Sequence, residues 1–239
     1  MTNQILSSLK INEDFAYLCG VLAGDGNIHI RLHKHDYAIK CVGNPKDEKD
    51  FYNTVIRDIF WKHVGIKIRP KLCDKGTTYG FVLNSKSLVL FLTEIIGLPK
   101  GRKDNLEIPK AFQTNKNLLK SFIQGFFDTD GCLSLKRRYR DYQYYPVVSC
   151  VSKSERIIDQ IFEFLKSEDF RVHKGKRSYY DRRINKAPIT YMVSMDGNLQ
   201  LLKWMNFIGF RHPKHLKKFD SWKEVNRKII AEGGLSQAF

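Results

Sequence analysis

The sequence predicts an α+β fold in which two pseudo-symmetric halves, each with the order αββαββα, form a single chain of 239 residues. Three observations support this prediction: a motif that occurs twice, alternating segments after each copy, and helices with recurring start and stop signals. We place an N-terminal half at residues 1–110 and a C-terminal half at residues 111–239. The length allows one large domain or two small ones.

The repeated motif marks one helix in each half. Residues 17–26 read YLCGVLAGDG and residues 122–131 read FIQGFFDTDG, so Asp25 and Asp130 occupy the same motif position. A repeat of this length indicates a duplicated structural unit.

Polar and apolar residues alternate after each motif copy, at 27–33 and at 132–138. Alternation with a period of two is typical of a half-buried strand. Further strand-like segments follow in the same order in both halves, at 37–43, 66–73 and 77–83 and at 144–151, 170–178 and 189–194.

A helix is expected between the strand pairs of each half. Asn44 and Pro45 give a start signal in the first half, and Ser152 with Glu155 predicts a capping box in the second. The final apolar helices are expected to end at a glycine, Gly97 and Gly209.

Small residues on the motif helices predict that these helices cross in close contact. Gly20 and Gly24 lie four residues apart and share one helical face, and Gly125 and Thr129 occupy the same places in the second copy. Because a glycine costs about 1 kcal/mol in a helix interior, its repetition indicates a packing role.

Asp25 and Asp130 are expected at the C-terminal ends of these helices, where the helix dipole disfavours an acid. A divalent cation would reverse that penalty, since carboxylates and free carbonyls are hard oxygen ligands. Two such acids brought together suit Mg²⁺ or Mn²⁺ and the activation of water for phosphoryl chemistry. The alternative is that each acid merely begins an Asp-Gly turn, but the matched positions favour the metal.

The charge of the chain favours a nucleic-acid partner. Forty-one Lys and Arg against 25 Asp and Glu give a formal net charge of +16. A basic protein from a salty or thermophilic cytoplasm is the alternative. The five cysteines form no CxxC pair, so we expect a reducing intracellular compartment (cytoplasm, nucleoid or organelle matrix) and no structural zinc. We expect neither a signal peptide nor a membrane span.

One face of the strands that follow the motifs is polar or basic, which suits a two-stranded ribbon in the major groove of DNA. A basic hairpin at 171–186 and a shorter counterpart in the first half would contact phosphates. The residues expected to contact DNA on these strands and hairpins are Asn27, His29, Arg31, His33, Lys67, Arg69, Lys71, Ser134, Lys136, Arg138, Arg140, Arg171, His173, Lys176, Arg177, Arg182 and Arg183.

The segments 18–26 and 123–131 resemble the two motif copies of the monomeric LAGLIDADG homing endonucleases, and 97–109 resembles the connection before the second motif. The resemblance covers nearly the whole chain. It implies a homing endonuclease-like fold with a saddle-shaped antiparallel sheet surface over double-stranded DNA. It further implies a monomer that cuts one phosphodiester per strand, with Mg²⁺ or Mn²⁺, and leaves 3′ overhangs.

The resemblance also implies roles for individual residues. Asp25 and Asp130 would be the catalytic metal ligands, with the carbonyls of Gly24 and Thr129 nearby. Basic residues would stand beside each site and polar ones at its edge, although each lysine can equally be a solvated charge. The implied basic residue of the first half is Lys103, those left open for the second half are Lys214 and Lys217, and the edge positions are Lys46 and Lys153.

The first motif departs from the family pattern, since Ala23 stands where the second copy has Asp128. We do not expect this difference to abolish cleavage. Two other functions are weighed against the nuclease: an RNA-binding maturase acting on its own intron RNA, and a DNA-binding regulator without cleavage. The initial Met and the lack of a terminal His-Asn favour a free-standing or intron-encoded enzyme over an intein.

Overall fold

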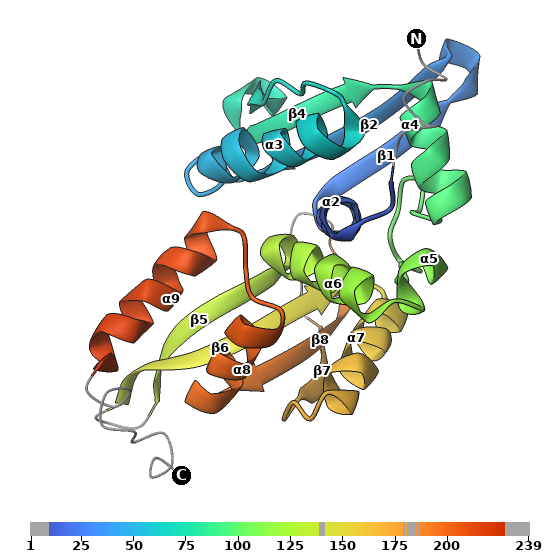
Figure 1. The fold of residues 1–239 in the computed structure, drawn as a ribbon. Helices are drawn as coiled ribbons and strands as arrows, with labels where there is room; N and C mark the ends of the chain where they lie inside the picture. Colours follow the sequence, from blue (N-terminus) through green and yellow to red (C-terminus); the bar gives the residue numbers. More distant parts are fainter. Residues whose placement is uncertain (1–9, 139–141, 179, 181–184, 186, 228–239) are drawn as a thin grey trace.

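Two four-stranded antiparallel sheets and the helices packed on them make up the molecule, as the α+β prediction requires (Figure 1). The structure, a computed structural model, describes residues 10–138, 142–178, 180, 185 and 187–227. The two sheets have the same strand order, β1-β2-β4-β3 and β5-β6-β8-β7. The pseudo-symmetric αββαββα architecture is therefore confirmed.

The first half follows the predicted order from its motif helix onwards. A continuous helical segment (η2, α3 and η3) crosses between the strand pairs, and α4 and η5 form the last helix. The elements are α2 (Glu13–Gly24), β1 (Gly26–Arg31), η1 (Leu32–Lys34), β2 (Asp36–Gly43), η2 (Phe51–Ile56), α3 (Arg57–Ile59), η3 (Phe60–Val64), β3 (Lys71–Cys73), η4 (Asp74–Gly76), β4 (Thr78–Asn84), α4 (Lys86–Leu90) and η5 (Phe91–Ile96).

The second half repeats this order, with longer strands and one further helix after α8. That helix, α9, packs against β5 and was not predicted. The elements are α5 (Lys110–Gln113), α6 (Lys116–Asp130), β5 (Gly131–Arg138), β6 (Tyr142–Ser152), α7 (Glu155–Ser167), β7 (His173–Ser178), β8 (Ile189–Asp196), α8 (Asn198–Phe207) and α9 (Pro213–Val225). The proposed division at 110/111 falls at the start of α5 and stays a prediction.

The motif helices α2 and α6 lie side by side at the junction of the halves, as predicted (Figure 1). A Cβ atom at Gly20 would overlap the carbonyl oxygen of Phe122, and one at Gly125 would overlap that of Tyr17. Only glycine allows so close an approach of the two backbones at these points. The two glycine contacts are therefore equivalent, one from each helix to the backbone of the other.

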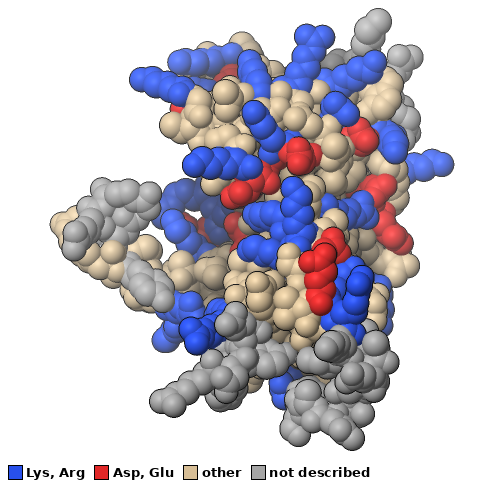
Figure 2. Space-filling model, turned by 90° about the vertical axis from the view of Figure 1, so that its left-hand side faces the viewer, with Lys and Arg blue, Asp and Glu red and all other residues tan. Residues whose placement is uncertain are grey.

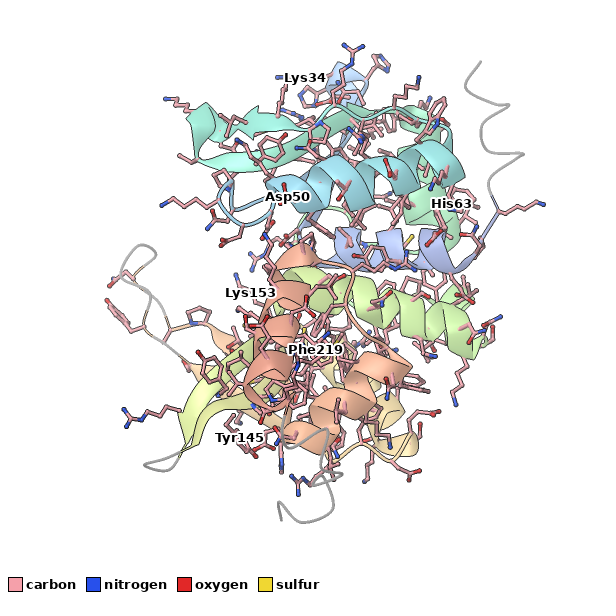
Figure 3. The ribbon with its side chains drawn as sticks, turned by 60° about the vertical axis from the view of Figure 1, so that its left-hand side comes forward. Lys34, Asp50, His63, Tyr145, Lys153 and Phe219 are labelled. Carbon is pink, nitrogen blue, oxygen red and sulfur yellow. The ribbon has the colours of Figure 1, made fainter. Side chains whose placement is uncertain are left out.

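A cluster of polar side chains connects the halves at the N-terminal end of α2. Asp14, in the first turn of α2, accepts a hydrogen bond at 2.5 Å from Arg211, which precedes α9. His63, labelled in Figure 3 beside the start of α2, lies 2.7 Å from the same carboxylate. The Arg211 guanidinium also stacks over the Tyr17 ring, 4.4 Å from its centre. The halves are thus joined by polar contacts as well as by the glycines.

The start signal predicted for the second-half helix is wrong in position. The N-cap of α7 is Ser154, while Ser152 is still paired with Tyr191 at the end of β6. The Ser152 hydroxyl accepts from the backbone N–H of Ser154 at 3.1 Å, so it supports the turn before the helix. The first-half start signal is also too early: the Asn44 side chain accepts from the N–H of Lys46 at 2.9 Å and starts a turn, but the helical segment η2 begins only at Phe51.

The last apolar helices end as predicted, at Gly97 and Gly209, both with positive φ. Among the described residues, no helix combines the length and the apolar character that a membrane crossing requires.

Candidate metal and nucleic-acid site

The two motif acids lie at adjacent helix ends. Asp25 caps the C-terminus of α2, with its N–H donating to the Val21 carbonyl at 3.0 Å, and Asp130 is the last residue of α6. A Cβ atom at Gly24 would overlap the Thr129 side chain and lie 3.5 Å from the carboxyl carbon of Asp130. The parallel packing therefore brings both carboxylates to one end of the helix pair.

A cavity of about 560 Å³ opens between the halves at this end. Lys and Arg side chains border the hollow between the halves in Figure 2. Residues from both halves line the cavity: Asp25, Gly26, Asn27, Gly101, Arg102, Lys103, Asp104, Leu106, Asp130, Val151, Ser152, Lys153 and Thr190.

Both carboxyl groups are held in conditions that disfavour their negative charge. Burial, followed by the nearby Glu48 and Asp130, raises the pKa of Asp25 to about 7. Burial also raises the pKa of Asp130 to about 6. Lys103 and Lys214 act in the opposite direction on both pKa values. Two buried acids that repel each other are characteristic of a functional site.

Lys103 reaches the acids from the connecting segment between η5 and α5. Its ammonium group donates to the carbonyl of Leu22 at 3.2 Å and to that of Gly24. Burial lowers the pKa of Lys103, while Asp130 and Asp25 raise it. The first-half lysine that the family resemblance implied is therefore beside both carboxylates.

Lys214 approaches from the first turn of α9 and lies 3.3 Å from the Glu48 carboxylate. It lowers the pKa of both Asp25 and Asp130. Lys217, one turn further along α9, is exposed, and its carbonyl accepts from the Ser221 hydroxyl. Of the two lysines left open by the sequence, the geometry favours Lys214 as the neighbour of the acids.

The donor set at the helix ends fits a hard divalent cation. Asp25 and Asp130 supply carboxylate oxygens, and the carbonyls of Gly24 and Thr129 stand at the same helix ends, although the Gly24 carbonyl already accepts from Lys103. Within the described part of the chain, no group of three or more His, Cys, Asp or Glu residues forms a metal cluster. Two carboxylates, completed by carbonyls and water, are a common setting for Mg²⁺.

The strands beside the cavity carry some of the residues that are predicted to contact DNA. Asn27 is exposed on β1 and lines the cavity. His29 and Arg31 both contact Asp36, at 3.3 and 2.8 Å. Lys153, labelled in Figure 3 near the junction of the halves, also lines the cavity.

One predicted strand position is wrong. β1 ends at Arg31, and His33 lies in the following turn, η1. Arg31 and Asp36 are the last pair of β1 and β2, and the hairpin closes there. The alternation of polar and apolar residues continues beyond this pair and therefore overestimates the length of the strand. His33 is therefore not on the strand face that carries Asn27 and His29.

The remaining predicted contacts are spread over both sheets. Ser134 and Lys136 lie on β5, and Lys46 is exposed in the turn after β2. Outside the described residues, or with an undescribed side chain, are Arg138, Arg140, Arg182 and Arg183. The exposed basic residues of and near the outer strands are Lys67, Arg69, Lys71, Arg171, His173, Lys176 and Arg177.

The sequence does not reveal Glu48 as a site residue. Its side chain is only 7% exposed, its charge raises the pKa of Asp25, and its carboxylate pairs with Lys214. It stands in the polar run 44–50, and no periodicity there marks one acid as buried.

Comparison with known proteins bears on this arrangement. Residues 117–191 match a family model described as a LAGLIDADG-like domain. The crystal structure of I-DmoI in complex with DNA and Ca superposes with a TM-score of 0.57 at 15% identity, over 83% of this chain and 90% of that one. The LAGLIDADG homing endonuclease I-GzeII in complex with its DNA target gives 0.56 at 13% identity, over 95% and 94%. The fold is that of the LAGLIDADG homing endonucleases.

Curated proteins similar in sequence to this chain include much longer ones. Reverse gyrase of Methanocaldococcus jannaschii is 24% identical over 234 residues, which are 94% of this chain and 13% of that protein. An uncharacterized protein of the same organism is 25% identical over 72% of this chain and 62% of its own length. The ribonucleoside-diphosphate reductase NrdEB subunit alpha of Bacillus subtilis is 26% identical over 54% of this chain and 12% of its own length. The chain thus spans less than two thirds of each of these relatives.

Proposed function

We propose that the protein is a site-specific double-strand DNA endonuclease that hydrolyses one phosphodiester in each strand and leaves 3′ overhangs. The observation that carries the proposal is the convergence of Asp25 and Asp130, from equivalent helix ends, in one cavity with Lys103 and near Lys214. Structures of I-DmoI with DNA and Ca, with DNA and Mn, and of its G20S variant with target DNA and Mg support a divalent metal.

The residues of the site have separate tasks in this reaction. Asp25 and Asp130 would hold Mg²⁺ or Mn²⁺, which supplies activated water and stabilises phosphoryl oxygens when bound. Lys103 and Lys214 place positive charge where negative charge develops on the phosphate. Burial lowers the pKa of Lys103 from its ordinary value, which favours exchange of a proton with water near the site.

The two sheets would bind a long DNA target with related but non-identical half-sites. The net charge of +16 supports an affinity for phosphates, and the polar faces of β1 and β5 continue from the catalytic acids. Both halves belong to one chain, so we propose that a monomer suffices for the cut.

The test is cleavage of a DNA library of candidate target sites, with Mg²⁺ and with EDTA. We expect metal-dependent double-strand cuts at one long site, lost by at least about 100-fold in Asp25→Asn and Asp130→Asn, since a lost ligand removes several kcal/mol. Both variants should still bind the target, because the acids do not contribute to phosphate attraction.

Other outcomes would replace this proposal. Tight and specific DNA binding without any cleavage would identify a regulator. Preferential binding of structured intron RNA would identify a maturase, for which the same basic surface would serve.

A further inference from the structure

We propose that Asp128 is a positioning residue for Lys214, so that cleavage of one DNA strand depends on it far more than cleavage of the other. This inference rests on the proposed nuclease function and adds a residue that acts through another group. Asp128 is fully buried, two residues before Asp130, and does not reach the cavity.

The Asp128 carboxylate holds the chain at the start of α9. One oxygen, Oδ2, accepts from the backbone N–H of Arg211 at 2.9 Å and of His212 at 3.1 Å. The same oxygen accepts from the Tyr17 hydroxyl at 2.6 Å, across the junction of the halves. Because two of these three donors are backbone N–H groups of adjacent residues, the buried carboxylate oxygen fixes the chain segment that leads into α9.

The segment fixed in this way leads directly to Lys214. His212 is the N-cap of α9, and its Nδ1 accepts from the N–H of Lys214 at 3.1 Å. The His212 ring stacks on Phe51 of the first half, with ring centres 4.2 Å apart. A displacement of this turn would move Lys214 away from Glu48 and from the two acids.

The motif helix of the first half, α2, has no equivalent acid. Ala23 occupies the matching motif position and carries no polar side chain. Lys103 is placed instead by its own bonds to the carbonyls of Leu22 and Gly24. Asp128 therefore acts on one lysine of the site and leaves the other in place.

The other oxygen of Asp128, Oδ1, has no hydrogen-bond partner among the described residues. A buried carboxylate with an unused oxygen reduces stability relative to a fully bonded or apolar side chain. The acid at this position is therefore poorly explained by stability alone, which supports a role in placing α9.

The test measures the cleavage rate of each strand separately, with a target DNA labelled on both strands and with Mg²⁺ in single-turnover conditions. In Asp128→Ala we expect one strand to slow by at least about tenfold more than the other, the range typical of lost supporting contacts at a metal site. Lys214→Met should slow the same strand, and adding Asp128→Ala to it should have little further effect. Asp128→Asn should recover most of the rate, since its amide oxygen can accept from both backbone N–H groups.

Equal slowing of both strands, or additive effects of Asp128→Ala and Lys214→Met, would overturn the proposal. A global loss of stability slows both strands, so the ratio of the two rates separates positioning from misfolding. Tyr17→Phe, which removes one donor but keeps both backbone bonds, should leave the ratio near that of the wild type.

Hydrogen exchange separates this inference from the proposed function. In Asp128→Ala, amide protection should fall in the 209–216 segment and remain in the 99–106 segment that carries Lys103. If the wild type cuts no DNA, the proposed function fails while this measurement still decides the role of Asp128. Unchanged protection at 209–216 would overturn that role.

Discussion

In the first half the lysine of the site lies on the connecting segment before α5, whereas in the second half it lies in the first turn of a helix. Lys103 donates to carbonyls at the end of α2, and Lys214 pairs with the Glu48 carboxylate. The acids, by contrast, occupy the same motif position and lie at the C-terminal ends of α2 and α6.

The difference follows from the contacts between the halves: the motif helices pack against each other, whereas the segments that carry the lysines lead into different elements. The motif helices contact each other, so a change in one copy must suit the other. The two connecting segments continue into different elements, α5 and α9, and have no such mutual constraint. Equivalent charges are therefore supplied by unrelated local structures.

The largest effect is expected at the helix crossing, where the halves are most alike. Gly20→Ala and Gly125→Ala should each lower the free energy of unfolding by about 2–3 kcal/mol, because the added Cβ overlaps a backbone carbonyl of the partner helix. Denaturant unfolding measures both losses. Gly175→Ala is the matched control, since a Cβ there meets no atom within 4 Å. A loss in only one of the two crossing variants would contradict the equivalence of the contact.

The second prediction concerns the lysines, where the halves differ. Lys103→Met and Lys214→Met should each reduce cleavage about 100-fold, since each removes positive charge beside the acids. Lys217→Met should change the rate little, because that side chain is exposed on α9. Single-turnover cleavage at saturating Mg²⁺ measures all three rates. A loss in Lys217→Met without a loss in Lys214→Met would show that the second half uses Lys217 and not Lys214.

The third prediction uses a buried histidine that the connecting segment of the first half lacks. Burial lowers the pKa of His212 to about 2, against about 6.5 when unfolded. The unfolded chain thus binds a proton below pH 6.5 that the folded chain does not. Its contribution to stability is complete above pH 6.5 and falls by about 1.4 kcal/mol per unit as the pH drops towards 2.

His212→Asn keeps an N-cap but removes this titration. The stability of the wild type relative to His212→Asn should therefore decline by about 1.4 kcal/mol per unit between pH 6 and pH 4. Other titrating groups, including the acids with raised pKa values, are common to both proteins and cancel. Chemical denaturation across this range measures the difference, and a constant difference would refute the assignment of His212 as a buried neutral group.

The smallest effect is expected on the outer strands, which differ in length: β7 has six residues and β3 has three. Lys176→Ala, on β7, should weaken DNA binding about fivefold in 0.1 M salt and reduce the salt dependence by about one ion. Lys67→Ala should do less, since Lys67 lies over the Trp61 ring at 4.4 Å. Binding titrations at several salt concentrations test the pair. Equal effects would indicate that β7 and the segment before β3 contact phosphates alike.

The sequence was informative where a physical constraint acts on neighbouring residues. The crossing of the motif helices followed from Gly20 and Gly125, and the joint location of the acids followed from that crossing. The start of the second-half helix could not be predicted from the sequence, because Ser152 and Ser154 have the same side chain and either could cap the helix. Only the pairing of Ser152 with Tyr191 across the sheet determines which of them ends the strand.

Contacts between distant segments account for the other omissions. Glu48 is buried because Lys214, far along the chain, packs beside it. α9 carries a start signal, Pro213 at its first position, but the strongly basic composition of the segment hides the helical periodicity that would confirm it. Basic residues are abundant in this chain, so residue type alone cannot show which lysines are close to the acids.

The glycine crossing has a consequence for how such a chain can change over time. Gly20 packs against the Phe122 carbonyl and Gly125 packs against the Tyr17 carbonyl, so the two halves contribute equivalent surfaces to the crossing. A contact of this kind is self-complementary, like the interface of a two-fold symmetric dimer. A half taken from another chain would meet the same helix crossing if its helix kept the glycine register, and it would also have to supply its side of the Asp14–Arg211 and Tyr17–Asp128 contacts. The helix crossing would therefore allow halves with different strand surfaces to be exchanged by recombination.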